Sequence, residues 1–246
     1  MNNRFKKDKK QLSIFITSGF PKLESTTEQI LFLQSKGIDF IEVGIPFSDP
    51  MADGPVIQDS SMIALQNGMN MDVMFNQLNS IKNELKIPLV IMGYLNPVLQ
   101  FGLENFLEKC KAQNIASVIL PDMSVEIYER FYKTQFEKYE IPVSFLITPF
   151  TSVERIKKIA ELSKNSFVYL VSNASITGEN KNIGSDLVEK YQEIKVLCNE
   201  TPLMLGFGIS TKEDILKAHK YCDGAIIGSA YIKSLKENFS IIDTWI

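Results

Sequence analysis

The sequence has few of the residues on which metal and redox chemistry depend. Among its 246 residues there are one histidine and three cysteines. Cys110, Cys198 and Cys222 are far apart and outside any CxxC spacing, which argues against disulfides and structural zinc and favours buried thiols. The one histidine, His219, stands in a lysine-rich helical pattern without a partner motif, so we expect it at the surface or its boundary, with no metal site.

Long apolar runs and a dominant charge are also missing. No apolar run approaches the roughly 20 residues needed to span a bilayer, and the run at 12–17 is too short for the core of a signal peptide. The net charge is only −3, which gives no electrostatic reason to bind nucleic acid or an anionic membrane. We therefore expect a cytoplasmic protein that binds neither.

Short β-branched runs alternate with amphipathic stretches along the chain, always in the order strand and then helix. This alternation predicts parallel strands joined by helical crossovers. The predicted strands span 12–17, 38–43, 88–93, 115–120, 141–147, 167–171, 202–206 and 223–227. Eight such strands in a chain of this length predict α/β architecture: a single (β/α)8 TIM barrel, with residues 1–246 as one domain.

The predicted helix starts agree with this alternation of strands and helices. Capping boxes are predicted at Ser25 with Glu28, Thr151 with Glu154, and Ser210 with Glu213. The rival architecture, an open doubly wound sheet, would carry a GxGxxG turn after an early strand. The sequence has no such turn, which favours the barrel.

Two connections are longer than the others. The segment between the second and third strands holds two helical patterns, which predicts an extra helix, and a polar loop over 172–185 follows the sixth strand. Both begin at the C-terminal ends of strands, where barrel enzymes build their active sites. Long loops in compact domains are often functional, so we expect the loop after the sixth strand to act as a lid.

Three carboxylates occur at or just after the second predicted strand, in FIEVGIPFSDPMADGP. Glu42 lies within the strand, while Asp49 and Asp53 follow in the loop, so all three should face one cavity mouth. One interpretation pairs Glu42 with an internal cation and uses the aspartates as helix caps. We favour catalysis, because Phe40 and Phe47 would desolvate Glu42 and raise its pKa, as a general acid near neutral pH requires. Asp53, in a polar loop, should stay ionised.

Two glycine-rich segments follow the last two predicted strands, GFGIS at 206–210 and IIGSA at 226–230. Barrel enzymes commonly bind phosphate at these positions, with loop amides and a helix N-terminus. Gly178 in the long loop could add another amide. No predicted strand ends in lysine, which disfavours a Schiff-base aldolase. The residues thus indicate carboxylate acid-base chemistry on a phosphorylated substrate.

Ordered motifs along nearly the whole chain resemble those of the tryptophan synthase alpha chain family. FIEVGIPFSDPMADGPVIQ is similar to the family signature, whose catalytic glutamate is followed by an aspartate eleven residues later; FITSGFP, GYLNPV, YLVSNASITG, GFGIS and IIGSA continue the likeness. The resemblance implies a carbon-carbon lyase of tryptophan biosynthesis. Its reaction would be the retro-aldol cleavage of indole-3-glycerol phosphate into indole and glyceraldehyde 3-phosphate.

The resemblance also implies a role for each matching residue. Glu42 would protonate the indole ring carbon that bears the glycerol chain and take the proton of the adjacent hydroxyl, while Asp53 assists at the ring N–H, with Tyr169 as the third catalytic residue. The phosphate ligands would be Gly178, Gly206, Gly208, Gly228 and Ser229, and the indole pocket would be lined by Phe15, Tyr94 and Phe207.

A partner is implied as well. In this family the PLP-dependent β subunit receives indole in an α2β2 complex, and the α chain binds no cofactor of its own. Asp49 and Pro50 match the segment that touches β. The lid departs from the family pattern SRxGVTG, since Asn173 and Ser175 replace its arginine and its first glycine.

Three alternatives remain open at this point. A stand-alone indole-3-glycerol phosphate lyase would not need β, and a catalytically weak barrel would mainly activate β. Another phosphate-binding barrel enzyme, such as an isomerase of the same pathway, would share the glycine-rich segments but should lack the pair Glu42 and Asp53.

Overall fold

The computed structural model describes residues 4–171, 185–237 and 239–245. The strands of these residues form one parallel sheet in the order β4-β3-β2-β1-β8-β7-β6-β5. Each strand overlaps one that the sequence predicts, so the strand predictions are confirmed. Their bounds are β1 Gln11–Thr17, β2 Phe40–Gly44, β3 Leu89–Met92, β4 Ser117–Ile119, β5 Leu146–Ile147, β6 Val168–Val171, β7 Leu203–Gly206 and β8 Gly224–Ile227.

The two ends of the sheet meet and close it into a barrel. Val118 of β4 forms a parallel bridge with Val143, which lies just before β5. The Val118 N–H donates to the Pro142 carbonyl and the Ser144 N–H donates to the Val118 carbonyl, each at 3.0 Å. Because proline has no N–H to donate, Pro142 limits the ladder along the predicted strand 141–147. The predicted (β/α)8 barrel is confirmed, with a narrow seam between β4 and β5.

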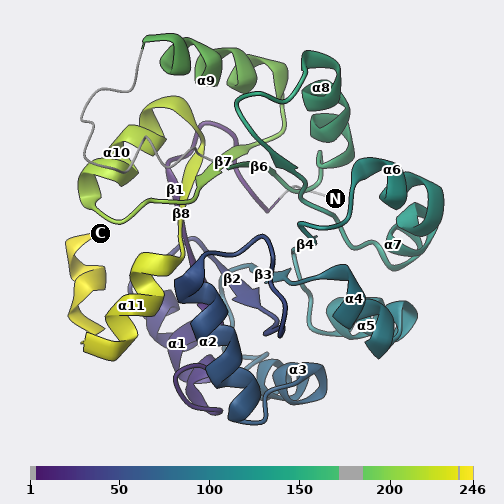
Figure 1. The fold of residues 1–246 in the computed structure, drawn as a ribbon, viewed down its shortest axis with the longest axis vertical. Helices are drawn as coiled ribbons and strands as arrows, with labels where there is room; N and C mark the ends of the chain where they lie inside the picture. The colour runs from purple at the N-terminus through teal and green to yellow at the C-terminus, as the bar shows by residue number, and fades with distance from the viewer. Residues whose placement is uncertain (1–3, 172–184, 238, 246) are drawn as a thin grey trace.

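Helices surround the strands as a ring (Figure 1). Both α2 and α3 lie between β2 and β3, so the predicted extra helix is confirmed. The long loop predicted after β6 falls on residues 172–184, outside the described residues. The helices are α1 Ser25–Ser35, α2 Pro55–Gln66, α3 Met71–Ser80, α4 Leu95–Phe101, α5 Leu103–Ala112, α6 Val125–Ile127, η1 Tyr128–Tyr132, α7 Lys133–Tyr139, α8 Val153–Leu162, α9 Ser185–Leu197, α10 Lys212–Tyr221, α11 Ser229–Glu237 and η3 Phe239–Thr244.

The predicted helix caps need correction by one residue. Ser152 caps α8, and Thr211 caps α10 in a capping box with Asp214; each lies one position after the residue we predicted. Both sequences offer two adjacent hydroxyl residues, and the one with extended backbone next to the helix forms the cap. The predicted cap at Ser25 is wrong, because Glu24 before it already has helical angles and Ser25 is the first residue of α1.

Aromatic rings fill the inner side of the barrel beneath Glu42. Alternation along β2 puts Phe40 and Glu42 on the same face. The Phe40 ring packs 5.1 Å from that of Phe5 and 5.5 Å from that of Phe167, between centroids. Since Phe5 precedes β1 and is buried, the N-terminal segment supplies one ring of this layer. The layer excludes water from the space beneath Glu42.

Other predictions about single residues are met. The three cysteines are free and buried. His219 lies in α10, partly buried, with its Nε2 atom 3.0 Å from the Gln11 carbonyl oxygen.

No helix of the described residues has the length and apolar character needed to cross a membrane.

Candidate active site

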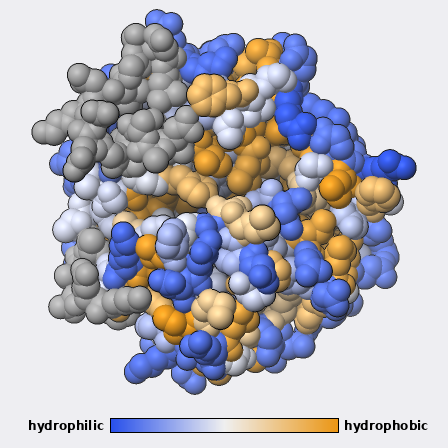
Figure 2. All heavy atoms as spheres, viewed as in Figure 1, coloured by the Kyte–Doolittle hydropathy of each residue, from blue (hydrophilic) through white to orange (hydrophobic). Residues whose placement is uncertain are grey.

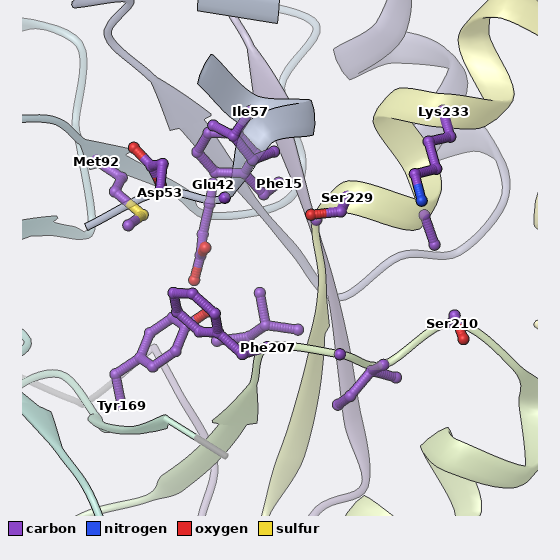
Figure 3. A pocket seen from close by; sticks show the side chains of 16 residues that line it. Phe15, Glu42, Asp53, Ile57, Met92, Tyr169, Phe207, Ser210, Ser229 and Lys233 are labelled. Carbon is purple, nitrogen blue, oxygen red and sulfur yellow. The ribbon is translucent and has the colours of Figure 1, made fainter. Parts of the chain in front are cut away.

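A cavity of about 410 Å³ lies at the C-terminal ends of the strands. Its walls come from β1, β2, β3, β6 and β8, from the loops that follow β2 and β7, and from the first parts of α2 and α11. Figure 3 shows the carboxyl groups and Tyr169 on one side and Ser229 and Lys233 on the other. In Figure 2, apolar side chains gather near the middle of the molecular face and hydrophilic ones dominate its rim. The cavity therefore has one end that carries the carboxyl groups and a separate end near a helix start.

Glu42 is fully buried at the base of this cavity. Neither of its carboxyl oxygens has a hydrogen-bond partner among the described residues. Burial raises the pKa of Glu42 from 4.5 to about 8, because the charged form loses its hydration without any compensation. The interpretation that an internal cation neutralises Glu42 is wrong for the described part of the chain. A protonated carboxyl near neutral pH can act as a general acid.

Asp53 reaches the same cavity from the loop between β2 and α2. Its carboxylate accepts a hydrogen bond of 2.9 Å from the Tyr94 hydroxyl, and this hydroxyl accepts one of 2.9 Å from the Ala52 N–H. Burial raises the pKa of Asp53, and the Tyr94 hydrogen bond opposes that rise. Asp53 does not cap α2, whose N-cap Gly54 has no side-chain cap bond. The hydrogen bonds fix its carboxylate toward the cavity.

Tyr169 faces the two carboxyl groups from β6 on the other side of the barrel. It is buried, and its pKa is raised well above the ordinary value, first by burial and then by the negative charges of Glu42 and Asp53. Its phenol stays protonated as a neutral donor. A Cβ on Gly206 would lie only 2.0 Å from the Tyr169 hydroxyl oxygen, so residue 206 must be glycine for Tyr169 to lie here.

Aromatic rings line the end of the cavity that carries Glu42 and Asp53. Phe207 adopts a φ of 69°, which non-glycine residues rarely do, and its ring meets that of Tyr169 edge-on at 6.3 Å. Phe15 lies over Gly44, where a Cβ would come within 2.4 Å of the ring. Residues held at rarely populated backbone angles, as Phe207 is, cluster at functional sites. The rings form a wall suited to a flat apolar group.

The opposite end of the cavity is lined by Gly208, Gly228 and Ser229. Ser229 is the first residue of α11, and Gly228 precedes it. The first turn of a helix presents N–H groups that have no partner within the helix, with the positive end of the helix dipole behind them. This end can therefore bind an anion such as a phosphate.

The family model of the tryptophan synthase alpha chain matches residues 1–243. The chain belongs to this family. Curated relatives described as tryptophan synthase alpha chains include those of Flavobacterium psychrophilum, 48% identical over 97% of this chain and 94% of the relative, and Christiangramia forsetii, 47% identical over 97% and 93%. Membership makes this chain a carbon-carbon lyase of tryptophan biosynthesis.

Solved structures agree with this assignment. A mutant tryptophan synthase alpha subunit from Pyrococcus furiosus superposes with a TM-score of 0.83 at 30% identity, covering 98% of this chain and 96% of that one. A tryptophan synthase chain from Mycobacterium tuberculosis gives a TM-score of 0.83 at 26% identity, covering 96% and 89%. The tryptophan synthase alpha family fold thus extends over nearly the whole chain.

Most site residues predicted from the sequence come together in the cavity. Those that line it are Phe15, Glu42, Asp53, Tyr169, Phe207, Gly208, Gly228 and Ser229. Gly206 lies behind Tyr169 rather than on the cavity surface. Tyr94 lines a narrow neighbouring cavity together with Pro50 and reaches the site through Asp53. Gly178, like Asn173 and Ser175, lies outside the described residues.

One predicted member of the carboxylate group does not reach the cavity. Asp49 is exposed and accepts a hydrogen bond from the neighbouring Ser48 hydroxyl. The prediction that three carboxylates face one cavity mouth is therefore wrong for Asp49. The turn at 50–53, closed by the hydrogen bond from the Asp53 N–H to the Pro50 carbonyl, directs Asp53 inward and leaves Asp49 in solvent.

Sequence reasoning missed other lining residues, including Ile57, Met92, Ser210 and Lys233. Ile57 and Met92 read as ordinary core residues in a sequence, since nothing but burial distinguishes them. Lys233 had a usable signal, because it stands four residues after Ser229 and α11 begins there. Residues four apart lie on one face of a helix, so a lysine at this spacing points to the same end of the cavity.

Proposed function

We propose that Glu42, Asp53 and Tyr169 act on the reacting atoms when this chain cleaves indole-3-glycerol phosphate into indole and glyceraldehyde 3-phosphate. The observation that carries the proposal is the fully buried Glu42 carboxyl, without a partner among the described residues and with a pKa raised to about 8. It shares one cavity with Asp53 and Tyr169. A retro-aldol cleavage needs such a group to give and take protons.

The proposed steps balance without any added reagent. Glu42 gives its proton to the indole ring carbon that bears the glycerol chain, and the Asp53 carboxylate stabilises the positive charge that develops at the ring N–H. The Glu42 carboxylate then removes the proton of the adjacent hydroxyl. The bond between ring and chain breaks, its electron pair restores the aromatic ring of indole, and the hydroxyl carbon becomes the aldehyde of glyceraldehyde 3-phosphate. Tyr169 supplies a neutral donor beside these groups.

The two ends of the cavity set the orientation of the substrate. The aromatic wall around Phe15 and Phe207 would hold the indole ring, with Tyr94 behind Asp53. Amides and hydroxyls at the other end would bind the phosphate; the proposed ligands are Gly178, Gly206, Gly208, Gly228 and Ser229. Of these, Gly208, Gly228 and Ser229 line the cavity surface. Holding both ends would align the bond to be cleaved with Glu42.

The proposal extends to the organisation of the protein. We infer that residues 1–246 act as one domain, that the chain carries no cofactor, and that it works in the cytoplasm. Its partner would be a PLP-dependent tryptophan synthase β subunit in an α2β2 complex. The Mycobacterium tuberculosis structures are described as tryptophan synthase, which supports such an assembly. The exposed Asp49, next to the buried Pro50, offers the contact.

Release of indole from indole-3-glycerol phosphate tests the proposal, measured with the purified chain alone and then with a tryptophan synthase β subunit. Slow release that β accelerates is the expected result. Fast release unaffected by β would identify a stand-alone lyase, and binding of β without any release would identify a barrel that only activates its partner. Sizing the chain with and without β tests the assembly separately.

A further inference from the structure

Lys233 reaches the cavity from α11. It follows Ser229 by four residues, so both side chains lie on the same face of the helix. Side chains in helices lean toward the N-terminus, which carries the Lys233 amine back over the first turn. Lys233 accordingly lines the cavity together with Ser229 and Ser210. In Figure 3 its amine points toward the side of the cavity on which these two serines lie.

Lys233 has an exposed side chain, which leaves its ammonium free to meet a ligand that enters the cavity. No carboxylate of the described residues forms an ion pair with Lys233. By contrast, the Lys36 Nζ atom lies 2.6 Å from Asp243 Oδ1, and the Lys138 Nζ atom lies 2.9 Å from Glu104 Oε1. A cation above the first turn of a helix also opposes the helix dipole. Its placement would be compensated by an anion between the amine and the helix start.

The charge balance of the cavity points to the same anion. Among the described lining residues, Lys233 is the single cation, and Glu42 and Asp53 are carboxyl groups. A phosphate ester carries nearly two negative charges at neutral pH, and backbone amides offer it only partial charge. Without a cation, the phosphate would enter a cavity whose nearest formal charge, that of the Asp53 carboxylate, is negative, because Glu42 is protonated near neutral pH.

We propose that Lys233 is a phosphate-binding residue, whose ammonium forms a charge-assisted hydrogen bond with the phosphate of the substrate at the start of α11. The inference rests on the proposed function, because it takes the phosphate end of the cavity as given. Lys233 would act in binding and not in proton transfer. Its loss should therefore raise KM far more than it lowers kcat.

The test compares Lys233→Met, Lys233→Arg and the control Lys217→Met. Lys217 is an exposed lysine of α10 that does not line the cavity, so its replacement makes the same change in net charge. The probe is sn-glycerol 3-phosphate, titrated by calorimetry, with indole as a second probe. We expect Lys233→Met to weaken glycerol 3-phosphate binding and raise KM by about 10-fold, as for the loss of one charge-assisted hydrogen bond. Lys233→Arg should recover most of this.

Two further readouts separate a phosphate contact from a structural role. Indole affinity should be unchanged in all three variants, and added salt should weaken glycerol 3-phosphate binding less steeply in Lys233→Met than in the parent chain. If Lys233→Met binds the probe as Lys217→Met does while the parent chain still releases indole, the inference is overturned and the proposed function stands. A parent chain that neither binds the probe nor releases indole overturns both.

Discussion

Tyr94 joins the carboxylate of Asp53 to the backbone of the loop that carries it. The Tyr94 hydroxyl donates to the Asp53 carboxylate and accepts from the Ala52 N–H, each across 2.9 Å. The next residue, Leu95, donates its N–H to both carboxylate oxygens of Asp122, at 3.0 and 3.1 Å. The loops after β2, β3 and β4 are thus linked through the Tyr94 hydroxyl and the N–H of the next residue, Leu95, and Asp53 is oriented by the Tyr94 hydrogen bond.

Removal of this hydroxyl should change both the rate and its pH dependence. Because the Tyr94 hydrogen bond lowers the pKa of Asp53, Tyr94→Phe should raise that pKa and move the acidic limb of kcat/KM to higher pH. We expect kcat/KM to fall by about 10-fold near neutral pH, the usual scale of one hydrogen bond to a charged group. A pH profile of indole release measures both effects.

Tyr128→Phe is the matched control for this variant. Tyr128 packs against Phe136 and Phe145, away from the cavity, so its replacement removes a phenol hydroxyl without touching Asp53. Its pH profile should be that of the parent chain. An acidic limb that stays in place in Tyr94→Phe would show that Asp53 is oriented by other contacts.

Glu42→Gln should nearly abolish cleavage while preserving the fold. Glutamine has almost the same shape but can neither give nor take a proton, and general acid-base steps contribute about 10² to 10⁴ in rate. We expect kcat for indole release to fall by at least about 10², with unchanged affinity for glycerol 3-phosphate. Near-normal turnover by this variant would exclude Glu42 as the acid.

The same substitution should change how stability depends on pH. The pKa of Glu42 is about 8 in the folded chain, above its ordinary value of 4.5, so the folded state retains a proton that the unfolded state has released. Stability from Glu42 is thus present below pH 4.5 and is lost as pH rises through 8, on the order of 5 kcal/mol in total.

Urea unfolding at pH 5 and at pH 8 measures this effect. The free energy of unfolding of the parent chain should fall more steeply between these values than that of Glu42→Gln, in which the titrating group is absent. Asp53 is present in both chains, so its own titration should largely cancel in the comparison. Parallel pH dependences in the two chains would contradict the raised pKa.

Gly206→Ala should displace Tyr169. A Cβ there would overlap the Tyr169 hydroxyl and ring, and overpacking of this kind typically costs about 1–3 kcal/mol. We expect lower stability together with slower indole release, and partial recovery of stability in the double variant with Tyr169→Ala. Gly54→Ala is the control for added volume, since a Cβ at Gly54 meets no heavy atom within 4 Å. Because Gly54 is the N-cap of α2, this control should itself lose up to about 1 kcal/mol. Equal stability of the two single variants would refute the contact.

The barrel could be predicted from the sequence because each strand is a short apolar run. The spacing of apolar residues in these runs differs from their spacing in the amphipathic helices between them. The sequence also predicted the burial of Glu42, since a carboxylate two residues after Phe40 must share its inward face. The exposure of Asp49 was not predictable, because it depends on the turn closed between Asp53 and Pro50. Lys233 was missed because its spacing from Ser229 is informative only once α11 is known to begin at Ser229.

The barrel does not close with equal strength around its circumference. β2, which carries Glu42, pairs with β1 from Ser13 to Thr17 and with β3 from Leu89 to Met92. Between β4 and the chain before β5, the backbone pairing is the bridge of Val118 with Val143, and the Ser117 hydroxyl adds side-chain hydrogen bonds with Pro142 and Ser144. Local opening starts where the fewest hydrogen bonds must break. The amides of Val118 and Ser144 should therefore exchange with deuterium sooner than those of β2. Local opening at the seam would therefore leave β2, and with it the position of Glu42, undisturbed.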